Sequence, residues 1–187
     1  LTISIILKIR EAVMRKSLFA CFMSAAALTG SGGFSGNSSM TVSSISFQNN
    51  DYLGSDFSCE GKDFSPEIHW KFQGKAETYA LICEDPDAPG GTFIHWVVYN
   101  IPGAYVNLAE GFPKSGEPDA IIQGRNDFGE TGYNGPCPPK GKIHHYVFTV
   151  YALDTRINEK GHTAAELKKA MKGHVMGSAS VTGLYKR

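Results

Sequence analysis

One stretch of the chain, residues 144–154, constrains the fold more than any other part of the sequence. It reads HHYVFTVYALD, and its residues alternate between two faces as they do in a β-strand. Beyond the first three residues both faces are apolar, with Phe148, Val150 and Ala152 on one face and Val147, Tyr151 and Leu153 on the other. A strand of this kind belongs inside a sandwich or barrel. Its first residues, His144, His145 and Tyr146, are polar and therefore need partners of their own.

Further short strand candidates recur along the chain with turn residues between them. They cover residues 42–47, 68–72, 78–84, 93–100, 120–123 and about 178–185. In residues 68–72 one face is apolar and His69 falls on the other, so we expect His69 to be a solvated edge residue. Many strands with one late helix predict a mainly β fold, an antiparallel β-sandwich of two sheets.

The late helix is predicted over residues 162–174. Thr163 and Glu166 have the spacing of a capping box, which marks a helix start. One face of the helix then carries Leu167, Ala170, Met171 and His174, a stripe that indicates core packing rather than a cofactor site. His174, at the helix end, is expected to meet the terminal carbonyl groups.

The first 30 residues have the order of a secretory signal peptide. Met14, Arg15 and Lys16 precede an apolar run of 12 residues, which is too short to span a bilayer. A lipidated start at Cys21 is the less favoured alternative. Residues 31–40, rich in Ser and Gly, are expected to be a flexible tether, and residues 41–187 a single domain. These features predict an exported protein, periplasmic or secreted, without a transmembrane anchor.

Charge argues against a nucleic-acid partner. Without residues 1–29 the chain holds 14 basic and 17 acidic residues, a net charge of −3. No basic stripe follows a surface that would track a phosphate backbone, and the main basic cluster, Lys168, Lys169 and Lys172, lies on the predicted helix. Nucleic acid is therefore not an expected partner.

Three cysteines follow the signal segment. Cys83 lies in an apolar strand candidate, where a small buried thiol is ordinary. Cys59 and Cys137 lie in loop sequence and are the favoured disulfide partners, because an exported chain meets oxidising conditions. Two separate free thiols are the alternative.

Polar residues stand at the ends of several strand candidates. Asp85 and Asp87 flank Pro86 at the end of one strand, and in extended chain two such carboxylates converge; a tight surface turn is the simpler interpretation when the motif is taken alone. His95 begins the next strand, and His144 and Tyr146 begin the stretch described first. Polar groups gathered at several strand ends predict one shared cavity.

Three long motifs resemble the phosphatidylethanolamine-binding protein family, in its exported bacterial, Raf-kinase-inhibitor-like branch. They are DPDAPGGTFIHWVV at residues 85–98, GRNDFGETGYNGPCPPKG at 124–141, and HHYVFTVYALD at 144–154. The resemblance covers about residues 42–185. It implies a sandwich of two antiparallel sheets with a small anion-binding pocket at one edge.

The resemblance also assigns pocket residues. Its motif positions fall on Asp85, His95, Pro139, His144 and Tyr146, with Asp87 as a lesser candidate. His145 stands where the family often has Arg, which puts outward charge pairing by this residue in doubt. The positions of Cys59 and Cys137 resemble those of cysteines in the exported branch and support their pairing.

Three functions are compatible with these features. The first is a non-catalytic binding protein for phosphate, phospholipid head groups or phosphorylated ligands, with no cofactor and no metal. The second is a regulator that inhibits a partner such as a kinase or protease, and a homodimer is left open. The third and least favoured is a metal-assisted hydrolase using His95, His144 and Asp85, since the sequence lacks an HExxH or GxSxG motif.

Overall fold

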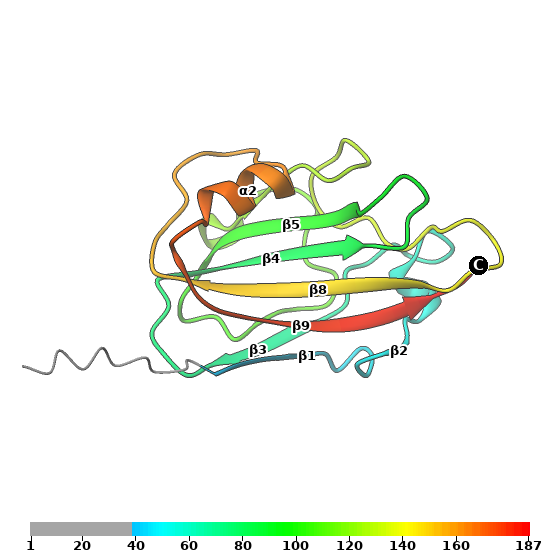
Figure 1. Cartoon of the computed structure of the whole chain (residues 1–187), viewed down its shortest axis with the longest axis horizontal. Coiled ribbons are helices and arrows are strands. Elements are labelled where there is room, and N and C mark those ends of the chain that lie inside the picture. Colours follow the sequence, from blue (N-terminus) through cyan, green and yellow to red (C-terminus); the bar gives the residue numbers. More distant parts are fainter. Residues whose placement is uncertain (1–38) are drawn as a thin grey trace, which may run out of the picture. The chain divides into compact units, whose positions relative to one another are not determined.

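The computed structural model describes residues 39–187, which form two β-sheets and one α-helix (Figure 1). The small sheet has the order β1 (Met40–Ser43), β3 (Ile68–Phe72), β6 (Asn107–Leu108). The large sheet has the order β2 (Asp51–Tyr52), β9 (Val175–Tyr185), β8 (His144–Leu153), β4 (Thr78–Asp85), β5 (Phe93–Pro102), β7 (Ile122–Gln123). The predicted β-sandwich is confirmed. The predicted signal peptide and most of the predicted tether lie outside the described residues.

Strand β8 has hydrogen-bonded neighbours on both sides. It pairs antiparallel with β4 over seven residue pairs, from Thr78↔Leu153 to Glu84↔Val147, and with β9 along its whole length. One pairing departs from the predicted antiparallel pattern, because β2 runs parallel to the end of β9, with Asp51 opposite Gly183. The backbone amides of Asn50 and Leu53 hold this short segment by donating to the carbonyls of Thr182 and Leu184.

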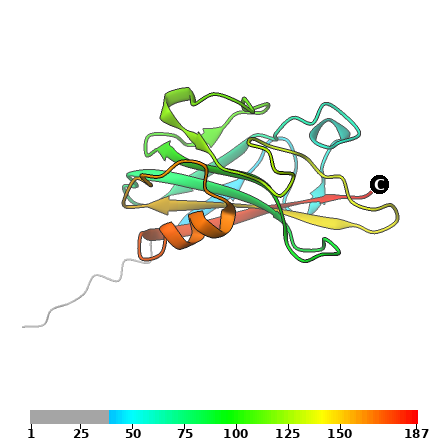
Figure 2. The ribbon, with the colours of Figure 1, turned by 90° about the horizontal axis from the view of Figure 1, so that it is seen from above.

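The large sheet is covered on both faces, which explains why β8 is apolar on both sides. One face carries Leu81, Trp96, Phe148 and Val150 and packs against the small sheet through Ile68 and Trp70. The opposite face carries Ala80, Ile82, Val97 and Tyr99 and packs against the helix through Leu167 and Met171. Figure 2 shows the helix and the small sheet on opposite sides of the large sheet. Each apolar face of the alternating strand therefore has its own core.

The helix, α2 (Ala164–Ala170), is shorter than the predicted 162–174 at both ends, but its predicted cap is confirmed. Its capping box is present, since the Thr163 hydroxyl accepts from the Glu166 amide and the Glu166 carboxylate accepts from the Thr163 amide. The chain then leaves the helix through Gly173, whose φ of 87° is in the left-handed region that glycine favours. The expected role of His174 is wrong: its Nδ1 lies 2.8 Å from Asp154 Oδ1, and its side chain is exposed.

Other boundaries also differ from the sequence predictions. The first strand stops at Ser43 because the Ser44 hydroxyl donates to the Glu67 carbonyl and accepts from the Ser46 amide, which replaces ladder bonds. The short strands β2 and β6 and the two 3₁₀ turns, η1 (Ser55–Phe57) and η2 (Pro118–Ala120), were not expected. Strands β3 and β8 have their predicted bounds, and His69 is exposed as predicted, but the predicted edge position of His69 is wrong because β3 lies between β1 and β6. Within residues 39–187, no helix has the length and apolar character needed to cross a membrane.

Candidate functional site

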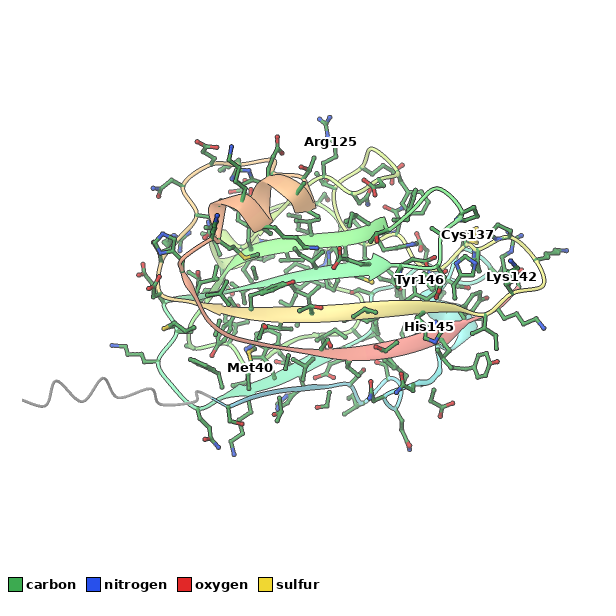
Figure 3. All side chains as sticks on the ribbon, in the orientation of Figure 1. Met40, Arg125, Cys137, Lys142, His145 and Tyr146 are labelled. Atoms are coloured by element: carbon green, nitrogen blue, oxygen red, sulfur yellow. A yellow bond between two sulfur atoms is a disulfide. The ribbon has the colours of Figure 1, made fainter. Side chains whose placement is uncertain are left out.

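A cavity of about 160 Å³ opens at the end of the large sheet where β4 finishes and β5 and β8 start. Figure 3 shows Cys137, Lys142 and Tyr146 at this end of the molecule. The five principal residues predicted for the pocket all line the cavity, together with Ala88, Pro89, Phe93, Phe128, Cys137 and Pro138.

The strand order explains why these residues meet. Strand β4 lies between β8 and β5 and runs antiparallel to both, so its last residue is next to the first residues of its two neighbours. Asp85 ends β4, His144 begins β8, and His95 is the third residue of β5. Each of these three residues is only 3% exposed. Three polar residues from distant parts of the chain are thus buried together by the topology of one sheet.

Asp85 and His144 form a buried pair. The distance from His144 Nδ1 to Asp85 Oδ2 is 2.7 Å, and because a carboxylate accepts, Nδ1 carries the proton. The other oxygen, Asp85 Oδ1, accepts from the backbone amide of Asp87 at 2.9 Å, which holds the carboxylate in place. The ring nitrogen Nε2 of His144 makes no hydrogen bond within residues 39–187 and is free to meet a ligand.

His95 is held differently, by a backbone carbonyl. Its Nδ1 donates to the Asn134 carbonyl at 2.7 Å, and the Asn134 amide donates back to the His95 carbonyl at 3.1 Å. Aromatic rings of Phe93, Phe128 and Tyr146 surround the imidazole, with centroids 5.0 to 5.4 Å away. Burial lowers the pKa of His95 and outweighs the opposing effects of this hydrogen bond and of Asp85. His95 is therefore a neutral imidazole at pH 7.

Tyr146 brings a hydroxyl group into the same region. Its side chain is 1% exposed, and the hydroxyl makes no hydrogen bond of good geometry in the described part of the chain, although the Asp85 carboxylate lies near it. Burial and then the negative charge of Asp85 raise the pKa of Tyr146 far above the usual tyrosine value. The phenol consequently stays protonated and can donate at any physiological pH.

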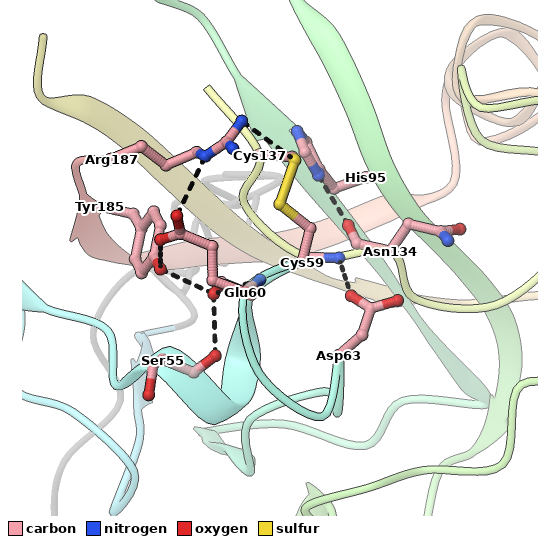
Figure 4. Close-up of a disulfide and its surroundings, with 11 residues drawn as sticks. Ser55, Cys59, Glu60, Asp63, His95, Asn134, Cys137, Tyr185 and Arg187 are labelled. Atoms are coloured by element: carbon pink, nitrogen blue, oxygen red, sulfur yellow. Dashed lines mark hydrogen bonds and ion pairs between the residues drawn. A yellow bond between two sulfur atoms is a disulfide. The ribbon is translucent and has the colours of Figure 1, made fainter. Parts of the chain in front are cut away.

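A disulfide holds the proline loop, residues 136–139, which lines one side of the cavity. Cys59 and Cys137 are bonded, with their Cα atoms 5.5 Å apart, as Figure 4 shows. The Gly135 amide donates to Asp63 Oδ1, and a Cβ atom at Gly135 would lie only 2.0 Å from the Phe57 carbonyl oxygen. This close approach needs glycine. The structure thus contains the predicted disulfide, and Cys83 is free and buried.

Asp87 does not line the cavity, so the predicted convergence of the two carboxylates is not observed. The strand ends at Asp85, and Asp87 lies in the following turn, where alternation no longer applies. Its Oδ2 accepts from the backbone amide and Nδ1 of His145, at 2.8 and 2.7 Å. These hydrogen bonds lower the pKa of Asp87. His145 therefore pairs outward with Asp87 although it is not Arg, and the pair is ionic when His145 is protonated.

Several contributors were not predicted from the sequence. Phe93 and Phe128 form apolar walls, and Asn134 orients His95 through its backbone. The turn at Asn126 could have been predicted from the sequence, because an Asn side chain commonly forms a turn by accepting hydrogen bonds from the amides that follow it. Asn126 Oδ1 accepts from the amides of Phe128 and Glu130, and its Nδ2 donates to Asn134 Oδ1.

Metal-ligand geometry is not observed for these residues. Over residues 39–187, no three His, Cys, Asp or Glu side chains are grouped so that they could hold a metal ion. The trio His95, His144 and Asp85 is gathered around one cavity, and hydrogen bonds engage the Nδ1 atoms of both histidines.

Comparison with known proteins gives the family. A family model described as phosphatidylethanolamine-binding protein matches residues 43–186, and the chain therefore belongs to the phosphatidylethanolamine-binding protein family. A UPF0098 protein of Pyrococcus horikoshii is 46% identical over 183 residues, which cover 92% of this chain and 90% of the relative. Family membership supports a binding protein.

Two solved structures are also similar. The crystal structure of a phosphatidylethanolamine-binding protein homologue from Chlamydia trachomatis has a TM-score of 0.73 and 36% identity, and the match covers 80% of this chain and 98% of that one. The crystal structure of YbcL from Escherichia coli, described as a new member of the mammalian family, has a TM-score of 0.70 and 32% identity, with 79% and 98% covered.

Proposed function

We propose that this chain is a non-catalytic binding protein whose cavity accepts the phosphoryl group of phosphate, a phospholipid head group or another phosphorylated ligand. The observation that carries the proposal is the buried, unpartnered hydroxyl of Tyr146 beside the Asp85–His144 pair. A buried polar group without a partner destabilises a protein by about 1–3 kcal/mol. A ligand oxygen that accepts this proton would relieve that penalty.

The donors of the cavity suit an oxyanion. Tyr146 offers an O–H, and His144, when protonated, offers Nε2–H while its Nδ1–H stays bonded to Asp85. Hydrogen bonds to a charged acceptor are shorter and stronger than neutral ones, and the apolar walls strengthen them by excluding water. Protonated His144 together with ionised Asp85 has no net charge, so a singly charged anion is not repelled.

The size of the cavity supports a small ligand. Pockets that enclose drug-sized molecules have volumes of roughly 300–1,000 Å³, and this one has about 160 Å³. A phosphoryl group with a short substituent is of suitable size, whereas acyl chains would have to stay outside.

The thiols support binding rather than covalent catalysis. A cysteine nucleophile reacts as its thiolate. Cys137, the cysteine at the cavity, is oxidised in the disulfide, and burial raises the pKa of the Cys83 thiol well above its usual value.

We also propose that the protein is exported. Two loop cysteines joined in a disulfide are typical of proteins in oxidising compartments. Amino-terminal sequencing of the mature protein tests this. We expect simple cleavage before or within residues 31–40; an uncleaved chain would contradict export, and a lipidated start at Cys21 would contradict simple cleavage.

The test of the binding function removes one hydroxyl. In Tyr146→Phe we expect phosphate binding to weaken by about one to two decades, because a hydrogen bond to a charged group contributes roughly 1.5–3 kcal/mol. Isothermal titration calorimetry with phosphate and phosphoethanolamine measures this. The matched control is Tyr151→Phe, on the same strand but away from the cavity, where affinity should be unchanged. Equal affinities for wild type and Tyr146→Phe would disprove the proposed site.

A further inference from the structure

The two histidines of the cavity have opposite hydrogen-bonding roles. Both carry a proton on Nδ1, but the partner of His144 is the Asp85 carboxylate, whereas the partner of His95 is an uncharged carbonyl. When His144 is protonated, the Asp85 carboxylate balances its charge and Nε2 donates. A neutral His95 with its proton on Nδ1 has only a lone pair on Nε2, so at this atom it accepts.

The orientation of His95 is fixed by its surroundings. The reciprocal hydrogen bonds with Asn134 lock the ring and its backbone, and Asn126 Nδ2 holds the Asn134 side chain at 2.6 Å. The rings of Phe93, Phe128 and Tyr146 pack around the imidazole, with centroids 5.0 to 5.4 Å away. Figure 4 shows Nδ1 turned toward Asn134 and the second ring nitrogen on the opposite side of the ring.

The charged groups around the cavity do not make His95 a cation. Burial lowers the pKa of His95 despite the carboxylates of Asp85 and Asp127, which act in the other direction. The remaining titratable or charged groups near the site come from the turn after β4, from β8 and from the end of the chain: Asp87, His144, His145, Tyr146 and Arg187.

A ligand oxygen that meets His95 Nε2 must therefore carry a proton. A bare oxyanion there would set two lone pairs against each other, whereas a P–OH group would donate a hydrogen bond. Phosphate monoesters have a second pKa of about 6 and keep this proton in part of the population near neutral pH. Phosphodiesters and sulfate esters are also singly charged, but they carry no proton in this range.

We infer that the cavity selects a singly protonated phosphoryl group, as in inorganic phosphate or a phosphomonoester, and rejects phosphodiesters and sulfate esters, with His95 as the specificity-determining residue. This inference rests on the proposed function and narrows it. Tyr146 and His144 donate to the charged oxygens, and His95 accepts from the P–OH group. The intact head group of a diacyl phospholipid, which is a phosphodiester, is then a poor ligand.

The test compares small ligands of matched shape with the full chain. Calorimetry at pH 7, where His95 is neutral and part of a phosphomonoester population keeps its proton, uses methyl phosphate, dimethyl phosphate and methyl sulfate, and inorganic phosphate is a fourth probe. We expect methyl phosphate to bind at least about tenfold more tightly than dimethyl phosphate or methyl sulfate, because a lost hydrogen bond leaves a buried group unsatisfied. If inorganic phosphate binds as tightly as methyl phosphate, free phosphate is a sufficient ligand; tighter methyl phosphate favours the ester.

The role of His95 has two separate readouts. In His95→Gln the amide can donate to a bare oxygen, so the ratio of methyl phosphate to methyl sulfate affinity should fall toward one, while the exposed control His69→Gln should keep the wild-type ratio. Nitrogen-15 NMR of the wild-type imidazole should show a neutral ring protonated on Nδ1 at pH 7. As pH falls below the lowered pKa of His95, Nε2 gains a proton and the preference should shrink.

The outcomes separate the two proposals. If dimethyl phosphate and methyl sulfate bind as tightly as methyl phosphate, the selectivity is wrong and the anion site stands. If NMR shows an imidazolium ring, or a proton on Nε2, the role of His95 is wrong whatever the affinities are. If none of the four probes binds, the proposed function itself fails, and the inference fails with it.

Discussion

Two Asp–His pairs, Asp85–His144 and Asp87–His145, lie where β4 ends and β8 begins, and they differ mainly in burial. In each pair Nδ1 of the histidine lies 2.7 Å from a carboxylate oxygen. The side chains of His144 and Asp85 are both 4% exposed, whereas those of His145 and Asp87 are 50% and 41% exposed. Water screens the outer pair, and such pairs contribute about 0–1 kcal/mol. Equal geometry therefore does not mean equal function, because only the buried pair lies in a cavity shielded from water.

The sharpest test of this difference is to remove each histidine. His144→Ala leaves the Asp85 carboxylate buried without its partner, and we expect the free energy of unfolding to fall by about 3–5 kcal/mol at pH 7. His145→Ala leaves Asp87 in water, and we expect a change below about 1 kcal/mol. Urea unfolding of both variants and wild type measures the difference. Similar losses in the two variants would show that burial does not distinguish the pairs.

Removal of the disulfide tests whether the cavity around the buried pair depends on the position of the proline loop. In Cys59→Ser/Cys137→Ser the unfolded chain loses a cross-link between residues 78 apart, and we expect a loss of about 2–4 kcal/mol. Phosphate affinity should also fall, since Cys137, Pro138 and Pro139 line the cavity. The Asp87–His145 pair lies outside the cavity, and the pKa of Asp87 measured by NMR should be unchanged. Wild-type affinity in the double variant would mean that the loop is positioned without the bond.

Asp85→Asn isolates the charge of the buried pair. The amide oxygen can still accept from His144 Nδ1, but it cannot stabilise a charged ring. We expect phosphate affinity to depend on pH differently in the variant and in wild type, because only the carboxylate can balance the charge of a protonated imidazole. Calorimetry across the range in which histidine titrates checks this, with Asp87→Asn as the matched control. An identical pH profile in Asp85→Asn and wild type would contradict the pairing role.

The sequence predicted the strands and residues that form this site better than the hydrogen bonds between them. The bounds of β8 followed from alternation, and the meeting of Asp85, His95 and His144 followed from family motifs at strand ends. Sequence could not show that Asp87 turns away, because the end of β4 at Asp85 depends on the local turn. Nor could it show that Asn134 fixes the proton of His95, since that contact is made by a backbone carbonyl, which every residue has.

The smallest expected effect concerns the outer pair and acid. Hydrogen bonds from His145 lower the pKa of Asp87, so its contribution to stability is present above the pKa of Asp in the unfolded chain, about 3.9, and is lost as pH falls through the lower folded value. Asp87→Asn cannot lose this contribution. We therefore expect the unfolding free energies of variant and wild type to converge by less than about 1 kcal/mol between about pH 5 and pH 3. Urea unfolding at several pH values measures this. If the difference between the two free energies of unfolding increases as pH falls, groups other than His145 also interact with the Asp87 carboxylate.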